Sequence, residues 1–392
     1  MTEWGLYVHI PFCQARCTYC DFNTVTGMGE AEHRRYTDAL IREWAGEMLP
    51  SGPLVSIFFG GGTPSLIDPH LLGRVIDRVD ARVGGISAAV EVTVETNPGT
   101  VTPEKLAILK EVGVNRLSIG AQARQNHHLL SLNRIHDVSA IDETVAMARD
   151  VGFRNINLDA IYGLPGQTLI EWQETVEGLL RLAPQHLSLY ALMVEAGTPL
   201  KQQLDRGQAV LPQEDAVADM ADWAETRLGA AGLLPYEISN YAIPGLESRH
   251  NRLYWQLEPY LALGAGAHAY VSPRRWWNVR GVRRYMELIE RGADPGDGEE
   301  ELTLAEEMRE YAWLGLRQRR GIDRAAFRAR FAIDPVVAFG SLVESLGGQG
   351  LLEWNESRLW LTARGRDVAS VTARALVDAP IEGLPAPSVP NS

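Results

Sequence analysis

Residues 9–20 read His9-Ile10-Pro11-Phe12-Cys13-Gln14-Ala15-Arg16-Cys17-Thr18-Tyr19-Cys20 and hold all 3 cysteines of this 392-residue chain. Any disulfide among three thiols leaves one over, and a four-ligand zinc shell is complete only if a histidine such as His9 joins them. Three thiolates suit a four-iron cluster whose fourth iron stays open to another ligand. The C-x3-C-x2-C spacing therefore predicts a 4Fe-4S cluster held by Cys13, Cys17 and Cys20, with a zinc site as the alternative.

The composition is that of a globular protein with a substantial core, since 45% of the residues are hydrophobic and 22% are charged. A length of 392 residues suggests about two domains. The net charge of −13 argues against a broad nucleic-acid or anionic-membrane footprint. Residues 1–4 lack the features of a signal peptide, and no apolar run is long enough to cross a bilayer. Clustered unpaired cysteines without an export signal predict a cytoplasmic protein.

Residues 1–235 alternate between short β-rich runs and longer helical patterns. The expected strands are Leu6–Ile10, Val55–Phe59, Ala89–Glu95, Arg116–Gly120, Asn155–Tyr162 and Leu187–Met193. The clearest helical patterns between them are Ala31–Met48, Pro103–Val112, Ser139–Val151 and Leu169–Leu182. Six strand–helix units predict an α/β fold with a parallel sheet, namely a partial (β/α)6 barrel similar to a TIM barrel. In such barrels the chemistry takes place at the C-terminal ends of the strands.

The rest of the chain is expected to form three further parts. Residues 236–295 are predicted to be a linker region, and residues 296–372 a winged-helix-like α+β domain. This domain is expected to contain the helices Leu302–Gln318, Asp323–Phe331 and Asp334–Leu346 and a hairpin of Leu351–Trp354 with Arg358–Leu361. Residues 373–392 are rich in proline without periodicity, which predicts a disordered tail.

Polar and glycine-rich motifs stand at the ends of the expected strands. In chain order these are Gly60-Gly61-Gly62-Thr63-Pro64, Glu95, Gln122, Arg134, Asp159 and Tyr162-Gly163-Leu164-Pro165-Gly166-Gln167. Consecutive glycines let a backbone approach a ligand closely and offer it N–H donors. Alternatively, the glycine run forms a plain turn, and Glu95 caps the turn that follows it. Taken together, the motifs predict a polar pocket at one end of the barrel.

These motifs resemble those of the radical S-adenosylmethionine (SAM) superfamily. The resemblance rests on the cysteine loop with Tyr19, the Gly-Gly-Gly-Thr-Pro run and the Tyr-Gly-Leu-Pro-Gly-Gln run. Two longer runs, Tyr7–Cys13 and Gly113–Gly120, are similar to the family of oxygen-independent coproporphyrinogen III oxidase. The resemblance extends over residues 5–370, which is nearly the whole chain.

The resemblance implies a role for each of the motif residues. Cys13, Cys17 and Cys20 would hold the 4Fe-4S cluster, and the amine and carboxylate of SAM would chelate its fourth iron. The implied SAM contacts are Gly61, Gly62 and Thr63 at the amino-acid end, Glu95 at the ribose, Tyr19 beside the adenine, and also Tyr7, Gln122, Arg134 and Asp159. With an electron donor such as a flavodoxin-type protein, such a cluster cleaves the sulfonium carbon–sulfur bond and yields a 5′-deoxyadenosyl radical.

Two features separate this chain from the decarboxylating oxidases of that family. The oxidases carry a fourth cysteine two positions beyond the triad, where this chain has Phe22. They also have an N-terminal extension, whereas only five residues precede Leu6. Both features resemble the heme chaperone (HemW) branch, in which Cys-Asp-Phe is typical, and this branch implies transfer of heme to an acceptor apoprotein. The alternative is SAM-dependent decarboxylation of a coproporphyrinogen in porphyrin biosynthesis, so whether the chain is an enzyme stays open.

A His-Asn-x-x-Tyr-Trp motif at His250–Trp255 supports the chaperone branch, where it is associated with heme. His250 is therefore a candidate axial ligand, because imidazole is the usual protein donor to heme iron. A histidine packed among aromatic rings is the alternative, and His268 is a competing ligand. The basic, aromatic run Arg274–Arg284 could bind heme propionates, make a peripheral membrane contact or form a solvated loop. The acidic net charge weighs against a nucleic-acid partner.

Overall fold

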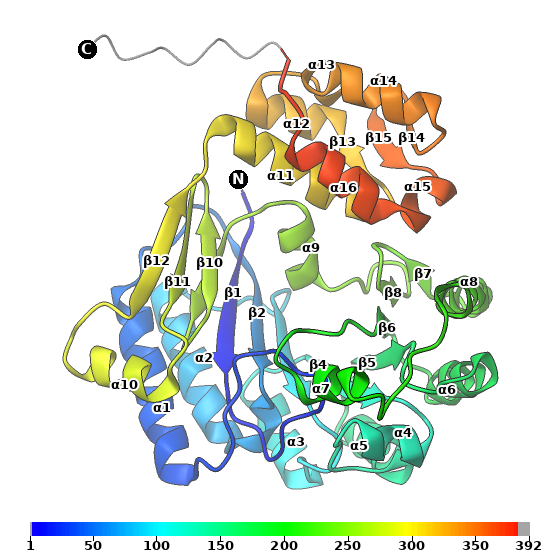
Figure 1. Cartoon of the computed structure of the whole chain (residues 1–392). Coiled ribbons are helices and arrows are strands. Elements are labelled where there is room, and N and C mark those ends of the chain that lie inside the picture. The colour runs from blue at the N-terminus through cyan, green and yellow to red at the C-terminus, as the bar shows by residue number, and fades with distance from the viewer. Residues whose placement is uncertain (1, 383–392) are drawn as a thin grey trace.

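The computed structural model describes residues 2–382, whose central element is a 12-stranded sheet (Figure 1). Six parallel strands occupy its middle, and strands that follow one another in the chain also pair in space. They are β1 (Trp4–Ile10), β2 (Leu54–Gly61), β3 (Glu91–Thr96), β4 (Arg116–Gln122), β5 (Asn155–Tyr162) and β6 (His186–Ala191). The predicted α/β fold with a parallel sheet is confirmed.

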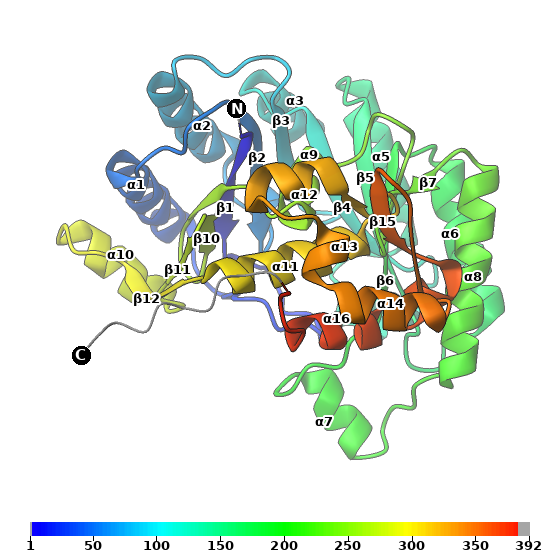
Figure 2. The same cartoon turned by 90° about the horizontal axis from the view of Figure 1, so that it is seen from above.

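Helices form an arc around the outer face of these strands, as Figure 2 shows. They are α1 (Glu30–Gly46), α2 (Pro69–Val83), α3 (Pro103–Glu111), α5 (Val138–Asp150), α6 (Leu169–Arg181) and α8 (Glu214–Ala230). The shorter η1 (Pro64–Leu66), α4 (Asn126–Ser131) and α7 (Pro199–Asp205) belong to the connections between strands. α6 illustrates why they form. Thr168 and Glu171 make a capping box at its start, and Trp172, Val176 and Leu179 repeat at helical spacing to form the buried face.

The sheet continues beyond both sides of the parallel strands. Next to β1 lie β9 (Tyr260–Leu263), β10 (His268–Val271), β11 (Arg274–Asn278) and β12 (Gly296–Glu301), and next to β6 lie β8 (Asn240–Ala242) and β7 (Leu234–Pro235). The helices α9 (Arg249–Trp255) and α10 (Val282–Glu290) connect these strands. The prediction that residues 236–295 form a linker is therefore wrong, because this segment adds strands to both sides of the barrel sheet.

Ion pairs stabilise the outermost strand, β12. Its sequence, Gly-Asp-Gly-Glu-Glu-Glu, has a low intrinsic preference for strand. Arg274 of β11 lies 2.5 Å from Glu299, and Arg275 lies 2.8 Å from Glu300. Two arginines of the basic run are thus already paired across the strands, which leaves them less able to bind an anionic membrane or a propionate.

The C-terminal domain has its own core, which includes Met308, Phe327 and Phe339. Its elements are α11 (Leu304–Arg317), β13 (Ile322–Asp323), α12 (Arg324–Phe331), α13 (Pro335–Ala338), α14 (Gly340–Gly348), β14 (Leu352–Trp354), β15 (Arg358–Leu361), α15 (Ala363–Asp367) and α16 (Ala369–Val377). The single helix expected over residues 334–346 is interrupted at Phe339, whose side chain turns into this core.

The expected disordered tail is also partly ordered. α16 continues to Val377, and Leu376 and Ala379 are buried in the core of the C-terminal domain. The rest of the expected tail, residues 383–392, lies outside the described residues. None of the helices within residues 2–382 is both long and apolar enough to span a membrane.

The C-terminal domain packs directly against α9. The guanidinium of Arg317, at the end of α11, lies between the indoles of Trp255 and Trp313, 4.8 and 4.9 Å from their ring centroids. Nε2 of Gln318 donates a hydrogen bond to the carbonyl oxygen of Trp255 at 3.1 Å. The last residue of the His-Asn-x-x-Tyr-Trp motif therefore belongs to the interface between the two domains.

Candidate cofactor-binding site

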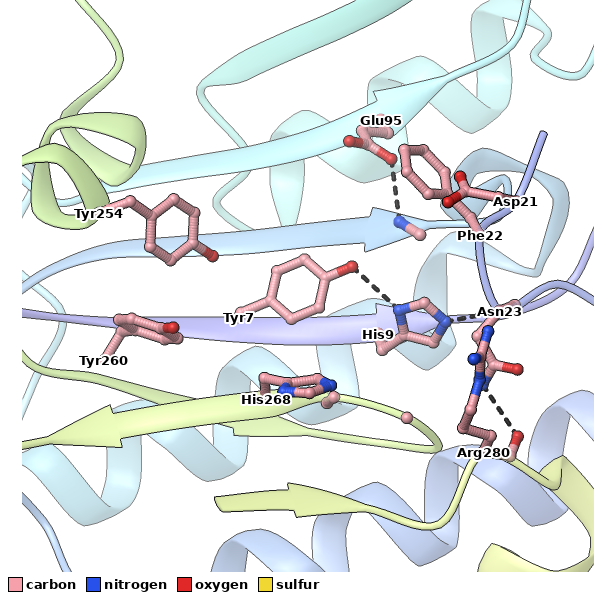
Figure 3. Close-up of a pocket in the computed structure, with 13 residues that line it drawn as sticks. Tyr7, His9, Asp21, Phe22, Asn23, Glu95, Tyr254, Tyr260, His268 and Arg280 are labelled. Carbon is pink, nitrogen blue, oxygen red and sulfur yellow. Dashed lines mark hydrogen bonds between the residues drawn. The ribbon is translucent and has the colours of Figure 1, made fainter. Parts of the chain in front are cut away.

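A cavity of about 460 Å³ opens beside the C-terminal half of β1 (Figure 3). It is lined by Tyr7, His9, Asp21, Phe22, Asn23, Gly61, Glu95, Tyr254, Tyr260, Gly266, Ala267, His268 and Arg280. These residues come from the parallel strands, from the loop just after Cys20 and from residues 254–280. The segment expected to be a linker thus builds one wall of the site.

The three cysteines lie, half-buried and free, in the loop after β1. Sγ of Cys13 is 3.6 Å from Oγ1 of Thr63, and Nη1 of Arg134 is 3.4 Å from Sγ of Cys17. Burial raises the pKa of Cys13, and it raises the pKa of Cys20 to about 11. Since metals bind the thiolate form, binding of a cluster here must displace protons from these sulfurs.

His9 does not complete a zinc site with these cysteines. Its Nδ1 lies 3.0 Å from the hydroxyl of Tyr7, and its Nε2 lies 2.9 Å from the carbonyl oxygen of Asn23, so both ring nitrogens are engaged. Within residues 2–382, the three sulfurs and a nitrogen of His9 do not gather within 4.8 Å of one another. The geometry disfavours the zinc alternative, and three thiols with no fourth protein ligand suit an iron–sulfur cluster with one open iron.

Arg134 connects the cysteine loop to the strand ends. Its Nη2 donates hydrogen bonds to Oδ1 of Asn97 at 2.5 Å and to the carbonyl oxygen of Gly120 at 2.8 Å. Its Nε is buried and has no hydrogen-bond partner among residues 2–382. A buried guanidinium N–H without a partner is costly, and a carboxylate satisfies it well. This group therefore fits a ligand with a carboxylate, such as the amino-acid end of SAM.

The glycine run lets two backbone segments come into contact. Gly61 has a φ of 110°, which favours glycine, and its N–H donates to Oε2 of Glu95 at 3.0 Å. A Cβ atom on Gly62 would lie 2.7 Å from the carbonyl carbon of Pro11, just before the first cysteine. Glycine is therefore required for packing the end of β2 against the cysteine loop.

Two half-buried carboxylates, Glu95 and Asp159, lie at the strand ends close enough for the charge of Asp159 to act on Glu95. Burial, followed by the charge of Asp159, raises the pKa of Glu95 to about 8. Burial also raises the pKa of Asp159, although Asn157 and Ser118 donate hydrogen bonds to it at 2.8 and 3.1 Å. A cationic ligand would stabilise both carboxylates in their charged form. SAM, which carries an ammonium and a sulfonium, is such a ligand.

The structure divides the predicted SAM contacts into two groups. Tyr7, Gly61 and Glu95 line the cavity. The others lie outside its lining: Gly62, Thr63, Tyr19, Gln122, Arg134 and Asp159. Among the latter, Arg134 and Thr63 touch the cysteine sulfurs. Three of the predicted residues thus lie at the cavity, and two others lie against the cysteine sulfurs.

His250 is not available as a heme ligand in this structure. Its side chain is 1% exposed, and burial lowers its pKa to about 3. Nδ1 lies 2.8 Å from Oγ of Ser56, Nε2 lies 2.8 Å from the hydroxyl of Tyr254, and the ring stacks on Phe58. The structure contradicts the prediction of His250 as an axial ligand, because both ring nitrogens are hydrogen-bonded, and it supports the packed-histidine alternative.

His268 is the histidine with an accessible ring at the cavity. It is exposed, and its ring stacks on that of Trp277 with centroids 5.6 Å apart. Figure 3 shows it on the opposite side of the cavity from Glu95. Asp21, for which no role was predicted, also lines the cavity, together with Arg280 of the predicted basic run and Phe22, which was noted only as the replacement of a cysteine. Phe22 is 63% exposed at this cavity, and the signal for it in the sequence is an aromatic residue two positions after Cys20.

Comparison with known proteins places this site in a family. Residues 7–179 match the sequence profile of the Radical SAM superfamily, and residues 302–368 match that of the HemN C-terminal domain. Among solved structures, coproporphyrinogen III oxidase (HemN) from Escherichia coli is similar with a TM-score of 0.82 over 96% of this chain and 90% of that chain. At 22% identity this likeness concerns the fold. Fold, cysteine loop and profile together define a radical SAM protein.

Sequence similarity to individual proteins identifies the family within this superfamily. The heme chaperone HemW of Bacillus subtilis is 36% identical over 362 residues, which cover 92% of this chain and 95% of the relative. The HemW of Escherichia coli is 37% identical over 68% of this chain and 70% of its own length. A mouse protein named radical S-adenosyl methionine domain-containing protein 1, mitochondrial, is 35% identical over 90% of this chain and 82% of its own length. The chain belongs to the HemW family of the radical SAM superfamily, which confirms the resemblance read from its motifs.

Proposed function

We propose that this protein is a cytoplasmic heme chaperone that binds heme, a 4Fe-4S cluster and SAM, and transfers the heme to an acceptor apoprotein. The observation that carries the proposal is a cavity next to the cysteine loop with an accessible histidine, His268, in its wall. Its volume of about 460 Å³ lies within the range typical of cofactor sites. The names of the relatives at 34–37% identity support the same function.

The cluster and SAM would be held at the barrel end of this cavity. Cys13, Cys17 and Cys20 supply three thiolates, and the free Nε of Arg134 supplies a donor for the carboxylate of SAM. Glu95 lies where it can accept hydrogen bonds from ribose hydroxyls, and its deprotonation accompanies binding of the cation. When bound, the cluster supplies one-electron reduction of SAM, for which a flavodoxin-type protein is a suitable electron donor.

Heme would be held at the opposite side of the cavity. His268 offers an imidazole to the iron, and the exposed guanidinium of Arg280 offers a partner for a propionate. The aromatic rings of Phe22, Tyr254 and Tyr260 supply apolar surface for the porphyrin. Each of these groups reaches the cavity in the described structure without a change of fold.

A titration of heme into the cluster-reconstituted protein under anaerobic conditions tests the ligand assignment. We expect a stoichiometric Soret band for the unmodified chain and for His250→Gln, because glutamine retains hydrogen-bonding capacity toward Ser56 and Tyr254. We expect the band to shift or disappear in His268→Ala. An unchanged band in His268→Ala together with a lost band in His250→Gln would reverse the assignment.

The alternative function, oxidation of a coproporphyrinogen, would use the same cavity and draws support from the shared fold of the oxidase. It is tested by supplying the reduced, reconstituted protein with coproporphyrinogen III and SAM in the absence of oxygen. The chaperone proposal predicts heme binding without formation of protoporphyrinogen. Robust formation of protoporphyrinogen would overturn it in favour of the enzyme.

A further inference from the structure

A second group of side chains with potential metal-ligand atoms lies outside the cavity, where α4 and α6 follow the ends of β4 and β5. Nε2 of His127 is 3.2 Å from Oε1 of Glu171, and Nε2 of His128 is 3.6 Å from Oε2 of the same carboxylate. Within residues 2–382 this is the group of three or more His, Cys, Asp or Glu residues whose ligand atoms all lie within 4.8 Å of one another.

The separations match those between ligands of one metal ion. Nitrogen and oxygen ligands lie about 2.0–2.1 Å from zinc, so two of them at a tetrahedral angle are roughly 3.3–3.4 Å apart. The separation between Nε2 of His127 and Oε1 of Glu171, 3.2 Å, is close to this value, and the three ligand atoms all lie within 4.8 Å of one another.

The buried histidine gives an independent indication of a missing ligand. His128 is 2% exposed, and its Nε2 is buried with no hydrogen-bond partner among the residues described. Buried polar atoms are almost always satisfied, so such a nitrogen calls for a partner that the described chain does not supply. With the ring proton on Nδ1, Nε2 of His128 offers a lone pair, which suits a metal ion and not an anion.

We propose that His127, His128 and Glu171 bind one divalent transition-metal ion of the zinc class, with water completing the coordination shell. Glu171 already accepts a hydrogen bond from the N–H of Thr168 on Oε2, as part of the capping box of α6, so Oε1 is the oxygen free for the metal. His127 has 64% of its side chain exposed, which gives the ion access from solvent.

The position of the site gives it a structural consequence. The last turn of α4 supports the cysteine loop through two hydrogen bonds from Thr18. The N–H of Thr18 donates to the carbonyl oxygen of Leu132 at 3.1 Å, and the hydroxyl of Thr18 donates to the carbonyl oxygen of Ser131 at 3.2 Å. An ion that joins α4 to α6 therefore fixes the helix on which the loop rests. The site acts on the support of the cluster and does not contact the cluster itself.

Zinc binding by the full-length, cluster-reconstituted protein tests the proposal, because the cysteines are then occupied. After equilibrium dialysis against Zn²⁺ and removal of free metal, we expect about one zinc per chain by mass spectrometry. The variants His127→Ala and Glu171→Gln should retain almost none. Glutamine at this position preserves the capping box, so the helix remains intact. His70→Ala, which removes another exposed histidine, is the matched control and should bind as the unmodified chain does.

A thermal measurement gives a second readout that does not depend on activity. Zinc should raise the unfolding temperature of the unmodified chain and of His70→Ala, but not that of His127→Ala, because a ligand of the folded state stabilises it by mass action. Failure of the unmodified chain to retain zinc would overturn the proposal. Equal zinc content in His127→Ala, Glu171→Gln and the control would overturn it as well.

Discussion

Nε2 of His250 lies 2.8 Å from the hydroxyl of Tyr254, one helical turn further along α9. This bond links the buried histidine of the His-Asn-x-x-Tyr-Trp motif to a tyrosine that lines the cavity. Ser56 of β2 holds the other ring nitrogen, so the orientation of His250 is fixed from two sides. The motif histidine therefore positions the wall of the cavity from behind.

His250→Ala should lower the free energy of unfolding by about 2–4 kcal/mol, because it removes the hydrogen-bond partner of the Ser56 and Tyr254 hydroxyls and opens a void against Phe58. Urea denaturation monitored by circular dichroism measures the change. The control His70→Ala removes an exposed histidine and should stay within about 0.5 kcal/mol of the unmodified chain. A loss for His250→Ala as small as that of the control would contradict the packing described here.

Glu95 should make the stability of the cofactor-free protein depend on pH. The pKa of Glu95 is about 8 in the folded state and 4.5 ordinarily. The contribution of this carboxyl to the stability of the folded state is therefore fully present below pH 4.5 and is lost as the pH rises through 8. Glu95→Gln removes this dependence while keeping an acceptor for the N–H of Gly61. The free energy of unfolding of the variant, measured by urea denaturation, should therefore rise relative to that of the unmodified chain as the pH increases. We expect this relative increase to be on the order of 1–3 kcal/mol between pH 5 and pH 8.5. A difference that does not change with pH would show that Glu95 is not perturbed in this way.

Gly62→Ala should displace the cysteine loop, since its Cβ would lie 2.7 Å from the carbonyl carbon of Pro11. We expect a loss of stability of about 1–3 kcal/mol and a reduced iron and sulfide content after reconstitution. Gly229→Ala is the matched control, because a Cβ there meets no atom within 4 Å and alanine is favoured in α8. Full iron content in Gly62→Ala would mean that the loop tolerates the shift.

Arg317→Ala should weaken the attachment of the C-terminal domain to α9. The substitution removes a guanidinium from between two indoles, each contact contributing about 0.5–2 kcal/mol. Faster proteolysis between the two domains and a lower unfolding temperature are the expected results. Arg320→Ala, an exposed neighbour, should leave both measurements unchanged. Identical proteolysis of the two variants would argue against the interface.

The parallel strands could be predicted from sequence because most are short runs in which apolar residues alternate with polar ones, as Val92 and Val94 do in β3 and Ile156 and Leu158 do in β5. The strand expected at Asn155–Tyr162 has these same bounds in the structure. The cysteine triad and the glycine run could also be recognised, since their spacing and conformational demands are local. Such features depend on neighbouring residues in the chain and are therefore visible without knowledge of the fold.

Features that depend on distant partners could not be predicted. β12 is a strand because arginines of β11 pair with its glutamates, which its own composition does not reveal. The helix expected over residues 334–346 breaks because Phe339 enters a core formed by residues from other elements. His250 was predicted to be a heme ligand because one of its two hydrogen-bond partners could not be recognised from the sequence. That partner, Ser56, lies 194 positions earlier in the chain.

The 12-stranded sheet described for residues 2–382 ends at β12 on one side and at β7 on the other. An unpaired strand edge invites another polypeptide to add a strand, which is a common route to aggregation. The edge at β12 carries the exposed acidic side chains of Asp297 and Glu301 in addition to the two glutamates paired with β11, and charged side chains on an edge strand disfavour the addition of another strand. The edge at β7 is two residues long and contains Pro235, which has no N–H to donate. A sheet of this width can therefore stay open at both sides without inviting self-association.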